Sequence, residues 1–179
     1  MAASGRDASL ALSPAEFAGR RRQLMDMAGD DAVLLLAAAP ERMRNADAAW
    51  PYRQDSDFHY LCGWPEPAAV LALLPGRQHG EVVLFCRERD PEHERWHGES
   101  VGTERAVADY GMDDAFPIED IDDILPGMME GRARVYCHFG REPEFDAQLM
   151  GWMRRLRQLR GGGVVPKEFA ALGHLLHDL

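Results

Sequence analysis

The 179-residue sequence lacks any apolar run close to the roughly 20 residues that a membrane-spanning helix needs. The longest such run, residues 32–39, has the length of a strand. The first seven residues are small and polar, so they lack the apolar core of a secretory signal. We therefore expect a cytoplasmic protein that makes no contact with a membrane.

Cysteine is scarce, with only Cys62, Cys86 and Cys137. The three lie far apart in apolar, strand-like segments, and no two of them have the spacing of a zinc knuckle. We expect three buried, reduced thiols.

Positive charge is also in deficit, with 20 Lys and Arg against 30 Asp and Glu, a formal net charge of −10. A nucleic-acid partner needs a basic face, so this balance argues against one. The one basic cluster, residues 154–160, comes late in a helical pattern, where cations complement the negative end of the helix. We interpret it as a solvated helix end.

The common catalytic motifs are missing as well. Glycines 161–163 follow a helix rather than a strand, so they do not form a phosphate-binding loop, and there is no Gly-x-Ser-x-Gly elbow. His59 and His138 fall in strand-like patterns, which is typical of core or edge residues. His174 and His177 have a spacing that suits a metal ion, but no acidic residue accompanies them. No catalytic residue and no metal ligand is assigned to this chain.

One segment does match a zinc-protease motif, because His93-Glu94-Arg95-Trp96-His97 reads H-E-x-x-H. Pro91 and Gly98 leave room for fewer than two helical turns around it. No third ligand follows at a recognisable spacing. We therefore expect a surface loop here, without a metal ion.

The pattern of apolar residues predicts an α/β domain with a mixed β-sheet flanked by helices on both faces. Ser13-Pro14 begins the first helix as an N-cap followed by proline. Strands are expected at residues 32–37, 58–62, 69–74, 81–86 and 134–139, with 69–74 and 81–86 forming a hairpin. Further helices are expected at residues 103–110, 118–129 and 143–160, and from residue 166 onward.

The most unusual segment is residues 50–67, which is rich in Trp, Pro, Tyr, Arg and Asp. Ion pairs among Arg53, Asp55 and Asp57 can pin a loop, and Tyr52 and Phe58 can bury against the sheet. The pair Asp55 and Asp57 also suits acid–base chemistry. Alternating aspartates at the start of a strand are more often solvated or salt-bridged, so we favour a packing role.

Several motifs in order resemble the N-terminal domain of Xaa-Pro aminopeptidases (aminopeptidase P, in the creatinase/prolidase group): Phe17 with Arg20 and Arg21, then Asn45-Ala46-Asp47, then Trp50-Pro51-Tyr52-Arg53-Gln54-Asp55-Ser56-Asp57-Phe58. Trp50 and Asp55 depart from the family's usual Tyr and Asn. The resemblance implies the creatinase/prolidase N-terminal fold, with ribonuclease H-like layering. It divides the chain into a disordered tail (residues 1–12), the domain itself (13–165) and the start of a linker helix (166–179) to an absent C-terminal pita-bread catalytic domain.

The same resemblance implies that the parent protein removes the residue before a proline at the second position of a peptide. Two Mn ions would be bound by the absent domain and none by this chain, which alone would be inactive. The chain would support a homo-oligomer and wall the substrate cleft, with Trp96 nearest the substrate as an apolar surface carrying an indole N–H. Alternatively, Trp96 only anchors its own loop. The other hypothesis for the whole chain is a free-standing, non-catalytic module of the same fold that binds peptides or proteins.

Overall fold

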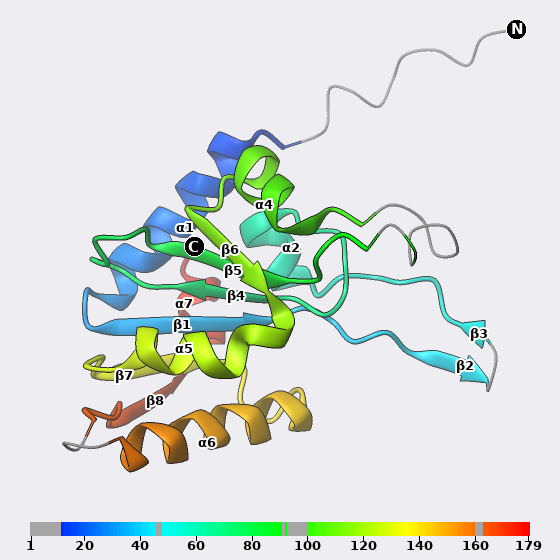
Figure 1. Cartoon of the computed structure of the whole chain (residues 1–179). Coiled ribbons are helices and arrows are strands. Elements are labelled where there is room, and N and C mark those ends of the chain that lie inside the picture. Colours follow the sequence, from blue (N-terminus) through cyan, green and yellow to red (C-terminus); the bar gives the residue numbers. More distant parts are fainter. Residues whose placement is uncertain (1–11, 46–47, 91, 93–99, 160–162) are drawn as a thin grey trace, which may run out of the picture.

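A six-stranded mixed sheet forms the centre of the protein (Figure 1). The computed structural model describes residues 12–45, 48–90, 92, 100–159 and 163–179. The order across the sheet is β6-β5-β4-β1-β7-β8. The strands are β1 (Ala32–Ala37), β4 (Val70–Leu73), β5 (Val82–Cys86), β6 (Asp114–Pro117), β7 (Arg134–Cys137) and β8 (Glu168–Ala171).

Strand β4 runs against the direction of the other five. It is antiparallel to both β1 and β5, whereas the pairs β1–β7, β7–β8 and β5–β6 are parallel. The predicted hairpin is confirmed, since Val70 pairs with Phe85 and Leu73 with Val82. As a result, the carboxyl ends of β1, β5, β6, β7 and β8 all lie along one edge of the sheet.

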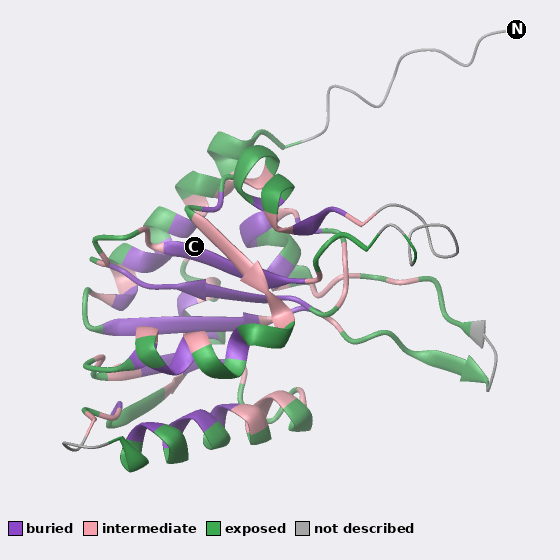
Figure 2. Cartoon of the chain, in the orientation of Figure 1, coloured by how far each residue is buried: buried purple, intermediate pink, exposed green. Residues whose placement is uncertain are grey.

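Helices cover both faces of the sheet, which confirms the predicted fold class (Figures 1 and 2). One layer contains α1 (Pro14–Ala28), α2 (Ser56–Cys62), α4 (Gly102–Tyr110) and α7 (Gly173–His177). The other contains α5 (Ile121–Met129), preceded by the 3-10 turn η1 (Ile118–Asp120), and α6 (Pro143–Gln158). Because side chains alternate along a strand, Leu34 and Leu36 pack in the first core and Val33 and Leu35 in the second.

A two-stranded ribbon, β2 (Met43–Asn45) with β3 (Ala48–Ala49), projects from the body beyond the end of β1 (Figure 1). None of the described helices is long and apolar enough to cross a membrane.

Helix α1 begins as the sequence predicts. The Ser13 hydroxyl accepts a hydrogen bond from the Glu16 amide at 3.3 Å, and the Ser13 amide donates to the Glu16 carboxylate at 2.6 Å. This reciprocal capping box satisfies two amides that the first turn would otherwise leave without partners.

The strand predicted at residues 58–62 is wrong, because this segment belongs to helix α2. The Asp55 carboxylate accepts hydrogen bonds from the amides of Asp57 and Phe58, both at 3.0 Å, and so caps the helix. Gly63 ends the helix with a φ of 65°, a left-handed conformation that favours glycine. The aromatic residues suggested a strand, but the capping aspartate decides the local structure.

The helix predicted from residue 166 is also wrong over its first part. Residues 168–171 form β8, which extends the sheet parallel to β7, and Val135 pairs with Phe169. The helix starts only at Gly173. Leu172 and Leu175 are buried in the core of the first layer, so residues 166–179 pack as part of the same domain. A continuation into a further domain stays a prediction.

Candidate functional site

The 50–67 segment leaves the ribbon, forms α2 and leads into β4, next to the edge where β1 ends. Gln54 holds its two ends together. The Gln54 side-chain oxygen accepts from the amides of Ala39 and Asp55, both at 2.9 Å. The Gln54 Nε2 group donates to the carbonyls of Trp64 at 3.2 Å and Glu66 at 2.9 Å. One side chain thus joins the end of β1 to both ends of α2.

Tyr52 strengthens the same junction. Its hydroxyl donates a hydrogen bond to the Ala39 carbonyl at 3.0 Å. Burial raises the pKa of the Tyr52 phenol to about 12, so it stays a neutral donor at physiological pH. Phe58 is completely buried, as the sequence predicts, whereas Tyr52 is half-buried.

Asp55 and Asp57 do form ion pairs, but with Arg141 rather than with Arg53. The Arg141 Nη1 atom lies 2.8 Å from Asp55 Oδ2 and 3.3 Å from Asp57 Oδ2. Arg141 follows β7, so these contacts fasten the start of α2 to the loop before α6. The sequence gave no signal for Arg141, because it is more than 80 residues away from its partners.

His138 completes this cluster. Its Nε2 atom lies 2.9 Å from Asp57 Oδ2, although the N–H is not aimed well enough to make a hydrogen bond. Burial, followed by the nearby Arg141, lowers the pKa of His138 against the opposing effect of Asp57 and Asp55. The two aspartates are thus engaged in structural contacts, which supports the packing role and leaves no free carboxylate pair for acid–base work.

Two consecutive arginines of α1 hold α2 in place. The Arg20 Nη1 group donates to the Tyr60 carbonyl at 2.9 Å, and its guanidinium lies 4.1 Å from the centre of the Tyr60 ring. Arg21 is 1% exposed, and it donates to the carbonyls of Leu61 at 2.9 Å and Gly111 at 3.0 Å. The Phe-x-x-Arg-Arg pattern at residues 17–21 therefore encodes the packing of one helix against the next.

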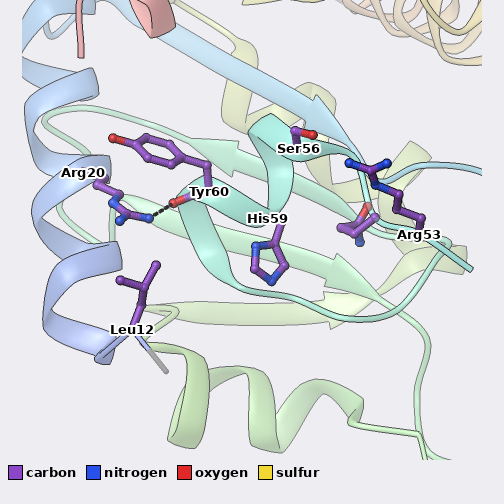
Figure 3. A pocket seen from close by; sticks show the side chains of 7 residues that line it. Leu12, Arg20, Arg53, Ser56, His59 and Tyr60 are labelled. Carbon is purple, nitrogen blue, oxygen red and sulfur yellow. Dashed lines mark hydrogen bonds between the residues drawn. The ribbon is translucent and has the colours of Figure 1, made fainter. Parts of the chain in front are cut away.

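A pocket of about 440 Å³ lies on this outer side of α2 (Figure 3). Arg20, Arg53 and His59 supply basic groups, and none of the lining residues is acidic. Ser56, His59 and Tyr60 share one face of α2 because they are three or four residues apart. Such a pocket can donate hydrogen bonds to an anionic group, but it contains no nucleophile with an adjacent base.

The described residues contain no group of three His, Cys, Asp or Glu side chains that could hold a metal ion. His174 lies against Tyr136, with 6.0 Å between the ring centres. Cys62, Cys86 and Cys137 are free and buried, as the sequence predicts, and burial raises the pKa of each thiol to about 12. Trp96 and the whole His93–His97 motif lie outside the described residues.

Comparison with known proteins gives the relationship directly. The family model for "Aminopeptidase P, N-terminal domain" matches residues 17–136. The Xaa-Pro aminopeptidase of Escherichia coli K12 is 36% identical over 148 residues, which cover 82% of this chain and 34% of that protein. The Xaa-Pro aminopeptidase of Haemophilus influenzae is 37% identical over 121 residues, or 68% of this chain and 28% of that protein.

Solved structures agree. The aminopeptidase PepP of Pseudomonas aeruginosa superposes with a TM-score of 0.90 and 55% identity, over 93% of this chain and 38% of that one. A zinc-substituted E. coli aminopeptidase P in complex with product gives a TM-score of 0.88 and 33% identity, with the same coverage. The chain thus spans about a third of the length of these relatives. It belongs to the aminopeptidase P family and corresponds to the N-terminal domain of that family.

Proposed function

We propose that the chain is the accessory N-terminal domain of a metal-dependent Xaa-Pro aminopeptidase, an enzyme that removes the residue preceding a proline. The observation that carries this proposal is the family match over residues 17–136, together with 93% coverage of the chain by an aminopeptidase structure. The substrate would be a peptide with proline at its second position, and the protein would act in the cytoplasm.

Catalysis would depend on two Mn ions in a separate C-terminal domain. When bound, such a metal pair supplies an acidic bridging water that attacks the peptide bond before proline. The described residues of this chain offer no site for the ions. The chain's own contribution would be to present a rigid surface beside the substrate, with Trp96 as the residue that reaches the cleft, and to support a homo-oligomer.

The projecting ribbon supports a role in contacts with further protein. Met43 is 60% exposed and Trp50 55% exposed, and the Arg44 guanidinium lies 5.1 Å from the centre of the Trp50 ring. Large apolar side chains gathered on a projecting element are typical of surfaces that another protein or domain covers.

The alternative is a free-standing module of the same fold that binds peptides or proteins without catalysis. The reading frame that encodes the chain discriminates between the two. A downstream segment with two Asp, one His and two Glu as metal ligands favours the peptidase, and a stop codon after Leu179 favours the module.

The biochemical test compares the purified 179-residue chain with the full product of that reading frame, using Xaa-Pro peptides and added Mn²⁺. We expect hydrolysis by the full product and none by the chain. Measurable hydrolysis by the purified chain would refute the accessory role. In the full product, Trp96→Ala is expected to slow turnover of tripeptides and longer peptides, whereas Met150→Ala, an exposed change on α6, is not. Unchanged turnover in the Trp96 variant would remove that residue from the cleft.

A further inference from the structure

A second cavity, which we call the α6 groove, lies on the opposite face of the sheet from the pocket in Figure 3. Its volume is about 630 Å³. Ala37 at the end of β1, Arg87 after β5 and Ile118 after β6 contribute to its walls, together with Glu142, Glu144 and Phe145 at the start of α6. In α/β proteins, ligands bind preferentially in crevices outside the carboxyl ends of strands, and the α6 groove occupies such a position.

The floor of the α6 groove is apolar and built from small side chains. Ala38, Ala69 and Val70 line it and are at most 8% exposed. Ile118 and Phe145 pack against the second core, and the Phe145 ring meets Trp152 edge-on at 5.9 Å between centres. Because small side chains stand where large ones would fill the space, the groove remains open over a rigid apolar floor.

The backbone is strained at the same place. Ala68 lines the α6 groove and has a φ of +50°, the only non-glycine residue with a positive φ in the part of the chain that the structure describes. This conformation costs an alanine of order 1 kcal/mol, and such strain is concentrated at binding sites. Glycine at this position would avoid the cost, so the strain adds to the reasons for regarding the groove as a site.

The rim of the α6 groove carries uncompensated negative charge. Glu41 lies 3.5 Å from Arg87 in an ion pair. Glu142 and Glu144 form no ion pair with any residue that the structure describes. Both stand at the amino end of α6, where the helix favours negatively charged side chains. The groove therefore combines an apolar floor with two free carboxylates.

We propose that the α6 groove binds a peptide segment of a partner protein in which an arginine or lysine stands beside an apolar residue. The apolar side chain occupies the floor formed by Ala69, Val70 and Phe145, and the cation lies between Glu142 and Glu144. Charge complementarity selects this partner over an acidic or neutral segment.

The test is a titration of the isotope-labelled chain with capped peptides, followed by NMR chemical shifts. The probe is acetyl-Leu-Arg-Leu-amide, and the comparison peptides carry Glu or Ala in place of Arg. Blocked ends keep the peptides from being recognised through their termini. We expect the Arg peptide to bind roughly two- to tenfold more tightly than the Ala peptide, the range for one or two partly exposed ion pairs. Shifts should concentrate at Ala37, Ala69, Ile118 and Phe145.

Variants separate the two halves of the groove. Glu142→Gln combined with Glu144→Gln should reduce the affinity for the Arg peptide to that for the Ala peptide. The matched control is Glu104→Gln, an exposed change on α4 outside the groove, which should leave all affinities unchanged. Ala37→Met fills the floor and should abolish binding of every peptide, with thermal unfolding checking that the variant is folded.

Three outcomes would overturn the proposal: equal binding of the Arg, Ala and Glu peptides, no binding of any of them at millimolar concentration, or shifts confined to the pocket around Arg53 and His59. If the reading frame encodes a longer enzyme, the titration is repeated with it. Loss of binding there would also contradict the proposal, because it would show that the groove is an internal contact between domains. Activity of the enzyme does not enter the readout, so the result is independent of the proposed function.

Discussion

Arg20, Arg21 and Arg22 are adjacent in the sequence but lie in three different environments. Arg20 stacks on Tyr60, Arg21 is enclosed between α1, α2 and the end of α4, and Arg22 pairs with Glu81 at the surface. Burial lowers the pKa of Arg21, but a guanidinium remains charged at any physiological pH. The planar guanidinium lets Arg21 reach two carbonyls on different segments, which a lysine cannot match.

We therefore expect Arg21→Lys to lower the free energy of unfolding by about 2 kcal/mol or more, because a buried carbonyl loses its donor. Arg22→Lys, the same change one residue along, should cost less than about 0.5 kcal/mol, since exposed ion pairs contribute little. Urea unfolding followed by circular dichroism measures both. Similar losses in the two variants would show that the buried contacts of Arg21 do not stabilise the fold.

His138 gives the protein a predictable pH dependence. Its pKa is lowered in the folded state, mainly by burial, so the folded protein binds a proton there less readily than the unfolded chain. The contribution of neutral His138 is complete above the ordinary histidine pKa of about 6.5 and is lost as the pH falls through the window below it.

Accordingly, the wild-type free energy of unfolding should fall more steeply between pH 7.5 and pH 5 than that of His138→Asn. His59→Asn, at an exposed position on α2, serves as the control and should retain the wild-type slope. Denaturant unfolding at a series of pH values gives the comparison. An identical slope in wild type and His138→Asn would show that the Asp57 contact offsets the effect of burial.

At the scale of elements, α2 depends on its cap more than on its composition. Asp55 accepts two amide hydrogen bonds and also pairs with Arg141. Asp55→Asn keeps a good capping side chain and removes the charge, whereas Asp55→Ala removes both.

We expect Asp55→Ala to cost about 1–2 kcal/mol of folding free energy and Asp55→Asn less than half of that. The same urea experiment measures the difference. Equal losses would mean that the ion pair with Arg141, rather than the cap, holds the start of the helix.

The elements that the sequence predicted correctly are those governed by local rules. Ser13, Pro14 and Glu16 encode the start of α1, and the Pro75-Gly76 turn between two apolar runs encodes the β4–β5 hairpin. The errors occurred where distant contacts decide the structure. Residues 168–171 are largely exposed and become a strand only because β7 offers a free edge. Likewise, nothing local indicates that Arg141 meets Asp55.

At the scale of the whole molecule, the last fourteen residues complete the sheet and one core. Leu172 is fully buried, and β8 covers the edge of β7. The boundary expected at residue 165 would cut through these contacts, so the linker role expected for residues 166–179 is combined with a structural one.

A chain that ends at residue 165 should therefore be much less stable than the 179-residue chain. Within the full chain, Leu172→Ala should cost about 2–5 kcal/mol, the range for a truncated buried leucine. Leu159→Ala, at a position 43% exposed, is the control and should cost less than about 1 kcal/mol. Thermal unfolding of the three proteins checks this. A shortened chain with unchanged stability would restore the boundary at 165.

The central position of β1 also has a consequence for how the protein is made. Val33 pairs with Val135, about 100 residues further along the chain, while the partners of β1 on the other side lie in β4. During synthesis from the amino end, α1, α2 and β4 emerge early enough to cover one edge of β1. The other edge stays open until β7 leaves the ribosome. For that interval, an apolar strand with unpaired amides and carbonyls is exposed, and it is the natural binding site for a chaperone on the nascent chain.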